Sequence, residues 1–178
     1  MTEQRLGILG GMGPQATQIF YQRILDMTDA ARDQDHVPTL IWSDTQMPDR
    51  TAAILGGGEG AEACYQRLLA GAKLLENAGC TILGIPCNTS HYFADRLQSE
   101  LKSLRLIHMV RETAAVMAQS GCRRVGILAT DGTVQTGVYQ RECEAQGLAC
   151  PALPAEVQKL VMSIIYDEIK RGETGSRE

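Results

Sequence analysis

Short apolar runs alternate with longer segments of helical periodicity along the chain, and this alternation constrains the fold more than any other feature. The short runs predict strands over 6–11, 38–44, 81–86, 105–110 and 123–130. The longer segments predict helices over 59–79, 134–146 and 155–171. Two further helices are predicted to begin at Pro14 and near Ser90, and another to end at about Ser120. Strands that alternate with helices predict an α/β fold, in which parallel sheets are flanked by helices on both faces.

Apolar residues at helical spacing predict which face of each helix packs on the core. The expected inward residues are Ile19, Phe20, Ile24 and Met27 in the first helix, Leu68, Leu69, Ala72 and Leu75 in the second, Phe93, Leu97 and Leu101 in the third, and Val157, Leu160, Val161, Ile164 and Ile165 in the last.

Charge and cysteine content exclude several classes of function. The formal net charge is −4 with both signs interspersed, so the chain lacks the basic surface of a nucleic-acid-binding protein. No apolar run reaches the roughly 20 residues that span a bilayer, and the N-terminus lacks the layout of a signal peptide. The six cysteines form no CxxC pair and no zinc-ligand spacing, so we expect a soluble, cytoplasmic protein with free thiols and no metal.

An internal repeat predicts two related lobes. "LGILGGMG" and the later "FYQR" resemble "VGILATDG" and "VYQR", and Gly7 matches Gly126 at nearly the offset by which Tyr21 matches Tyr139. We therefore expect a pseudo-twofold duplication, with one α/β lobe over 1–115 and a second over 116–178, and a site in the cleft between them. The counterpart of Cys87 would fall beyond Glu178, so the second lobe is expected to be incomplete.

Cys87 follows the strand predicted over 81–86, where it would lie at the carboxyl end of the sheet, the end that carries active sites in α/β folds. Asn88, Thr89 or Ser90 would cap the helix that follows. A helix N-terminus favours negative charge and therefore the thiolate, which can act as a base or a nucleophile. His91 would be either the partner of this thiol or a helix-surface or packed histidine.

The loop "GMGPQA" (11–16) matches a weak dinucleotide-binding pattern, because it follows a strand and opens a helix. The acidic residue expected about 20 positions later is missing from its place, and Asp44 lies further along the chain. The alternative is a tight turn whose backbone N–H groups face the cleft and could bind a carboxylate.

Further polar residues follow the predicted strands. Arg50, in "DRT" (49–51), can bind a carboxylate with two hydrogen bonds, or it can be a surface arginine. Thr130 and Thr133 offer hydroxyl groups to a ligand, or they cap the next helix. Lys170 is by default a solvated charge near a helix C-terminus.

Together these pieces resemble the aspartate/glutamate racemase family, and aspartate racemases in particular. The matching stretches are "LGILGGMGPQAT" (6–17), "DRT" (49–51), "IPCNTSH" (85–91), "GILATDGT" (126–133) and "IIYDEIKRG" (164–172). The resemblance implies racemisation of an acidic amino acid without a cofactor, by two cysteines on opposite sides of the substrate Cα, in a protein that is often a homodimer. It makes Cys87 one of the two cysteines and Arg50 and Lys170 carboxylate binders. The remaining residues implied to line the substrate site are Met12, Thr51, Asn88, Thr89, Thr130 and Thr133.

One departure from the family pattern leaves alternatives open. The family's second cysteine lies in a "GCTE"-like segment after the last helix, and these 178 residues contain no such segment. The chain is therefore expected to lack a C-terminal segment and to be a poor racemase as supplied. The alternatives are a single-cysteine decarboxylase or isomerase of small dicarboxylates, and a non-catalytic dicarboxylate binder.

Overall fold

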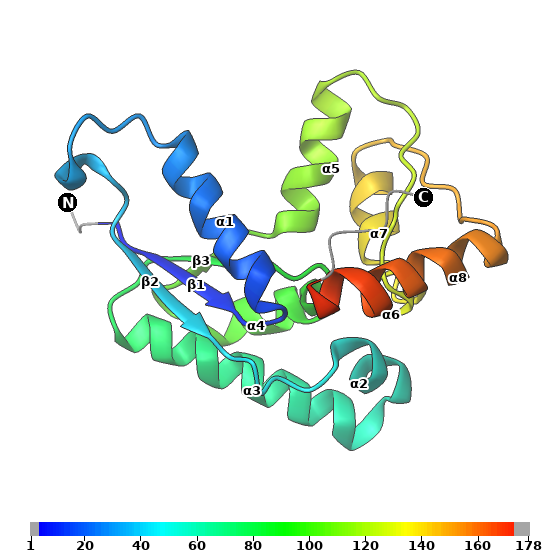
Figure 1. The fold of residues 1–178 in the computed structure, drawn as a ribbon, viewed down its shortest axis with the longest axis horizontal. Coiled ribbons are helices and arrows are strands. Elements are labelled where there is room, and N and C mark those ends of the chain that lie inside the picture. The colour runs from blue at the N-terminus through cyan, green and yellow to red at the C-terminus, as the bar shows by residue number, and fades with distance from the viewer. Residues whose placement is uncertain (1–3, 173–178) are drawn as a thin grey trace. The chain divides into compact units, whose positions relative to one another are not determined.

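The computed structural model describes residues 4–172, which form two compact units that divide after His108. The boundary drawn from the repeat, at residue 115, lies within α5 (Met109–Gln119). The first unit is an α/β fold with a parallel four-stranded sheet flanked by helices, as the alternating pattern predicted (Figure 1).

The sheet of the first unit has the strand order β2-β1-β3-β4, and every neighbouring pair is parallel. With η marking a short non-α helical turn, the elements are β1 (Leu6–Gly10), α1 (Pro14–Met27), η1 (Asp33–Asp35), β2 (Thr39–Ser43), α2 (Arg50–Gly56), α3 (Gly58–Asn77), β3 (Ile82–Gly84), η2 (Thr89–Phe93), α4 (Ala94–Glu100) and β4 (Arg105–Leu106). The first strand in sequence thus lies in the middle of the sheet, between β2 and β3.

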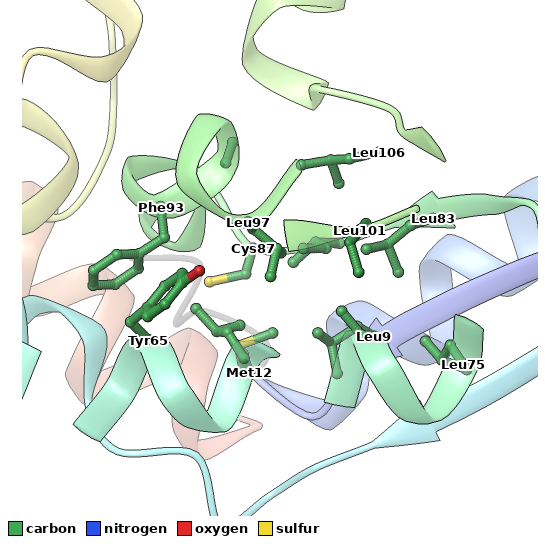
Figure 2. Packing of buried hydrophobic residues seen from close by; sticks show 14 of the residues in the cluster. Leu9, Met12, Tyr65, Leu75, Leu83, Cys87, Phe93, Leu97, Leu101 and Leu106 are labelled. Carbon is green, nitrogen blue, oxygen red and sulfur yellow. The ribbon is translucent and has the colours of Figure 1, made fainter. Parts of the chain in front are cut away.

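The main core lies between the sheet and α3 (Figure 2). Leu68, Ala72 and Leu75 of α3 are fully buried, which confirms the predicted inner face of this helix, although Leu69 is only partly buried. The predicted apolar residues Phe93, Leu97 and Leu101 are also buried in this cluster.

The glycines at the end of β1 allow the chain to pack closely on both sides. A Cβ on Gly10 would lie 2.3 Å from the Thr17 side chain of α1, and a Cβ on Gly11 would lie 2.4 Å from the backbone of Asp44. Gly11 also has φ +88°, a conformation that favours glycine. Its N–H donates to the Thr17 hydroxyl at 2.9 Å, so this donor is already used by the protein. The turn is therefore tight, as the alternative to dinucleotide binding predicted, but the Gly11 N–H is not left for a carboxylate.

The predicted inner face of α1 is wrong in part. Ile19 and Met27 are 61% and 84% exposed, whereas Thr17 is buried and the Phe20 ring lies over Gly84 of β3. Thr17 and Phe20 are three residues apart and share one side of the helix, so Ile19 points away from it. Apolar periodicity alone did not identify a polar residue, Thr17, as the contact with the sheet.

The second unit is mainly helical. Its elements are α5, α6 (Asp131–Gln135), α7 (Val138–Ala145), α8 (Ala155–Ser163), a π-helical turn η3 (Ile164–Glu168) and a 3₁₀ turn η4 (Ile169–Arg171). The strand predicted over 123–130 is wrong, because only one parallel bridge forms there, between Arg124 and Ala149. In the described part of this unit no further strand joins that bridge, and a parallel pair gains little stability without one.

Two helix predictions in this unit also need correction. The helix predicted over 134–146 is interrupted at Gly137, which has φ +66°, and becomes α6 and α7. Of the five residues predicted to face inward in the last helix, only Val161 is buried, and Leu160 is 64% exposed. Among residues 4–172, no helix is both long and apolar enough to cross a membrane.

Candidate active site

Three polar loops follow the carboxyl ends of neighbouring strands in the first unit. The loop after β1 carries Met12, the loop after β2 leads to Arg50, and the loop after β3 carries Cys87. Because β1 lies between β2 and β3, these loops meet at one edge of the sheet.

Cys87 lies at the border of the main core and is 9% exposed. Its backbone N–H donates to the carbonyl oxygen of Ile85 at 2.8 Å, which turns the chain sharply after β3. Figure 2 shows Cys87 in the part of the apolar cluster where Met12, Tyr65 and Phe93 gather. The Cys87 side chain therefore lies among apolar residues and has little contact with water.

The helical start after Cys87 differs from the prediction. Residues Thr89–Phe93 form a 3₁₀ turn, and the α-helix begins only at Ala94. Asn88 precedes the turn in a helical conformation, and its side chain makes no capping hydrogen bond. The chain around Cys87 is thus held by other contacts than the predicted helix cap.

Arg50 is buried although it carries a charge, since only 9% of it is exposed. It is the first residue of α2, whose start is capped by the Asp49 carboxylate accepting from the Ala52 N–H at 2.8 Å. Its Nη1 donates to the carbonyl oxygens of Met47 at 3.4 Å and Pro48 at 2.8 Å. Its Nη2 donates to the carbonyl oxygen of Met12 at 3.2 Å.

Two N–H donors of Arg50 are left by these three carbonyl groups, one on Nε and one on Nη2. Nε is buried and has no hydrogen-bond partner among the described residues, and Nη2 uses one of its two hydrogens. The Nε–Nη2 edge matches the two oxygens of a carboxylate. Three backbone carbonyls thus fix Arg50, and the buried Nε remains as a donor for a ligand.

Met12 connects Arg50 with the loop that follows Cys87. Its carbonyl oxygen accepts from Arg50, and its sulfur accepts from the Ser90 hydroxyl at 3.3 Å. Met12 is 6% exposed and Ser90 is 2% exposed, so both contacts are inside the protein. The sequence predicted Met12 as a lining residue, but Ser90 only as a possible helix cap.

Cys64 of α3 is a second thiol in this region that the sequence analysis did not select for the site. Burial raises the pKa of the Cys64 thiol, whereas the charge of Arg50 lowers it and Cys87 raises it further. Cys64 is therefore close enough to Arg50 and Cys87 to interact with both electrostatically. Its helical position gave no signal of this proximity in the sequence.

The ion pair between Asp44 and Arg67 stabilises the loops that follow β1 and β2. Arg67 of α3 donates to both carboxylate oxygens of Asp44 at 2.7 Å, and this pairing lowers the pKa of Asp44. The Asp44 N–H donates to the carbonyl oxygen of Gly10 at 3.1 Å. The pair thus fixes the end of β2 against the glycine turn.

The other predicted residues of the first unit follow Arg50 or Cys87 closely in the sequence. Thr89 is buried, Thr51 is half-buried beside Arg50 in α2, and Asn88 is exposed directly after Cys87. His91 is 3% exposed, and its Nδ1 lies 2.9 Å from the carbonyl oxygen of Cys87. His91 is thus packed inside the protein and contacts the Cys87 main chain, while a role as partner of the thiol stays a prediction.

Three predicted residues belong to the second unit. Thr133 is fully buried and its hydroxyl lies 3.3 Å from that of Thr130, which precedes α6 without capping it through its side chain. Lys170 is exposed in η4, and its ammonium lies 3.8 Å from the centre of the Tyr166 ring. A cation–π contact of this kind was not predicted from the sequence.

Comparisons with known proteins agree with this architecture. A curated relative, the broad-specificity amino-acid racemase RacX of Bacillus subtilis (strain 168), is 30% identical over 146 residues, which is 80% of this chain and 61% of RacX. The chain thus spans less than two thirds of the length of that relative. The solved structure of Picrophilus torridus aspartate racemase is 34% identical with a TM-score of 0.79, covering 95% of this chain and 69% of that one.

A further solved structure, an aspartate racemase homologue from Pyrococcus horikoshii OT3, shares the fold at 24% identity with a TM-score of 0.75, over 96% of this chain and 73% of that one. The profile of the family described as Asp/Glu/Hydantoin racemase matches residues 9–176. This match covers nearly the whole chain and includes the glycine turn, Arg50 and Cys87. The chain therefore belongs to the Asp/Glu/hydantoin racemase family.

Proposed function

We propose that this chain is an amino-acid racemase that works without a cofactor and in which Cys87 is one of two catalytic bases. The observation that carries the proposal is the buried Arg50: on its Nε–Nη2 edge, Nε has no hydrogen-bond partner among the described residues, and Nη2 donates to Met12, a neighbour of Cys87 in the apolar cluster. A carboxylate on this edge would bring the substrate Cα into the region of the thiol. Membership of the racemase family supports the same reaction class.

In the proposed reaction the Cys87 thiolate removes the α-proton of the amino acid. The S–H bond forms, the Cα–H bond breaks, and the electron pair remains on the carbon and its carboxylate. Arg50 stabilises this developing charge, an interaction that is strong because the guanidinium is buried. A second acid then donates a proton to the opposite face of Cα, which gives the other enantiomer. The motif match assigns that second thiol to none of the six cysteines in the sequence.

The substrate is proposed to be aspartate or glutamate. Arg50 would bind one carboxylate, and Lys170 the other. Thr51, Asn88, Thr89, Met12, Thr130 and Thr133 are proposed to line the site. The names of the relatives support both acidic and broader amino-acid substrates, since one is an aspartate racemase and another a broad-specificity racemase. A cytoplasmic homodimer is the proposed form of the enzyme.

Proton NMR in deuterated buffer tests this function directly. D- and L-aspartate, and then the glutamates, are incubated with the chain while loss of the Cα proton and optical rotation are followed. Loss of the Cα proton is expected for the wild type, and Cys87→Ser should abolish it. Accompanying racemisation would mean that another residue or another chain supplies the second base. Cys80→Ser is the matched control, because Cys80 is also buried but precedes β3, at the opposite end of that strand from Cys87. Full activity in folded Cys87→Ser would refute the role of Cys87.

A single-cysteine decarboxylase or isomerase is the second candidate. It is favoured by the fact that only Cys87 matches a catalytic cysteine of the family pattern. Incubation with maleate or a substituted malonate, followed by product analysis, separates it from a racemase. Calorimetric binding of aspartate without any turnover would instead indicate a dicarboxylate binder.

A further inference from the structure

Two histidines lie buried together beside the Cys87 loop. His91 belongs to η2, and His108 follows β4 by two residues. They are 3% and 8% exposed, and their ring centres are 5.0 Å apart with an edge-to-face angle of 64°. Buried imidazole nitrogens are normally hydrogen-bonded, so the groups bonded to His91 indicate which part of the backbone it stabilises.

Hydrogen bonds fix the backbone of Cys87 on both sides. Its N–H donates to Ile85, and its carbonyl oxygen lies 2.9 Å from Nδ1 of His91. In an α-helix that carbonyl would accept from the N–H of residue 91, four positions later. Here the His91 N–H donates to the carbonyl oxygen of Asn88 at 3.1 Å instead. The His91 side chain therefore provides a hydrogen bond that the 3₁₀ turn does not.

The protonation state of His91 suits this task. Burial lowers the pKa of His91 to about 4, and His108 lowers it further, while hydrogen bonding to the backbone of Cys87 and Ile107 acts in the opposite direction. The ring is thus neutral at pH 7 and carries one N–H. A carbonyl oxygen can only accept, so the 2.9 Å contact with Cys87 is a hydrogen bond in the tautomer that carries the proton on Nδ1.

We propose that His91 is a positioning residue for Cys87: its Nδ1–H holds the Cys87 carbonyl and thereby fixes the direction of the thiol toward the substrate. This inference rests on the proposed function only in taking Cys87 as the reacting group. It differs from the expectation that His91 is the partner of the thiol, because the contact at 2.9 Å is with the main chain of Cys87.

Two substitutions of His91 separate the hydrogen bond from simple packing. In His91→Asn the amide nitrogen can occupy the place of Nδ1, whereas in His91→Gln the amide lies one carbon further out. A misplacement of about 1 Å at a reacting group can cost roughly 100-fold in rate. We therefore expect His91→Gln to lower kcat for α-proton exchange about 10- to 100-fold with KM within about 2-fold, and His91→Asn to restore kcat to within about 3-fold. His108→Asn is the matched control: it should lower Tm as His91→Gln does, yet leave kcat within about 3-fold.

A second readout does not depend on racemase activity. The rate at which iodoacetamide alkylates Cys87 is measured by peptide mass spectrometry, with the exposed Cys122 as the internal reference. His91→Gln should change the Cys87 rate relative to Cys122, and His91→Asn should return it to the wild-type value.

Three results would overturn the proposal: an unchanged kcat and alkylation rate in His91→Gln, equal losses in the Asn and Gln variants, or an equal loss in His108→Asn. If the wild type shows no α-proton exchange, the proposed function fails, and the alkylation rates alone decide whether His91 positions Cys87.

Discussion

The glycine turn after β1 allows a prediction whose magnitude follows from the structure. Gly11→Ala would place a Cβ 2.4–2.6 Å from backbone atoms of Asp44, at a residue with φ +88°. Gly79→Ala is the matched control in the same compact unit, because Gly79 has φ +81° and its Cβ would meet only the end of the Arg5 side chain, at 3.3 Å. The two variants share the conformational strain and differ in the clash.

The left-handed conformation costs an alanine roughly 1–2 kcal/mol, so Gly79→Ala should lower the free energy of unfolding by about that amount. Overpacking typically adds about 1–3 kcal/mol, and the rigid backbone of Asp44 places Gly11→Ala at the upper end, at about 3–5 kcal/mol in total. A loss of this size is a large part of the roughly 5–15 kcal/mol that stabilises an ordinary domain.

Urea unfolding followed by tryptophan fluorescence measures both variants. Trp42 is the only tryptophan and lies in β2, two residues before Asp44, so its emission reports on this unit. If Gly11→Ala and Gly79→Ala lowered the free energy of unfolding equally, β2 would have moved away from the new Cβ at little energetic cost. The close packing at Gly11 would then not account for its stability effect.

Three further predictions concern the surroundings of this turn and the first unit. Arg50→Lys keeps the charge but loses the planar edge, so kcat/KM for the proposed racemisation should fall by about 100-fold, measured against wild type by NMR exchange. Thr17→Val removes the acceptor of the half-buried Gly11 N–H and should lower the free energy of unfolding by about 1–3 kcal/mol in the urea assay. Burial opposes ionisation of Glu76, but hydrogen bonds from the backbone of residues 102–104 and from Lys73 lower its pKa from 4.5 to about 2. The stability that Glu76 contributes is therefore present above pH 4.5 and lost as the pH falls toward 2, so Glu76→Gln should reduce the loss of urea resistance over that interval.

The sequence predicted the first unit well because its signals are local. Apolar runs marked β1, β2 and β3, Pro14 and Gly79 marked helix boundaries, and the position of Cys87 after a strand placed it at the correct edge of the sheet. These features depend on hydrophobic periodicity and on backbone preferences, which can be read within a few residues.

The contacts that shape the site were not predictable in the same way. Arg50 reaches Met12 across 38 residues of sequence, and nothing in "DRT" indicates that three backbone carbonyls orient its side chain. The run "VGILAT" has the composition of a strand, but it forms only one bridge, since a strand depends on its neighbours as much as on its own residues. The internal repeat, the two-lobe boundaries and the second base stay predictions.

The central place of β1 in the sheet has a consequence for synthesis on the ribosome. Although β1 emerges first, its second neighbour, β3, pairs with it only after more than seventy further residues have been made. The nascent chain therefore carries β1 with one open edge through much of its translation, and non-local parallel pairing of this kind is slow. Once β4 has emerged, every strand of the sheet is outside the tunnel, so we expect the first unit to fold while the helices after His108 are still being made.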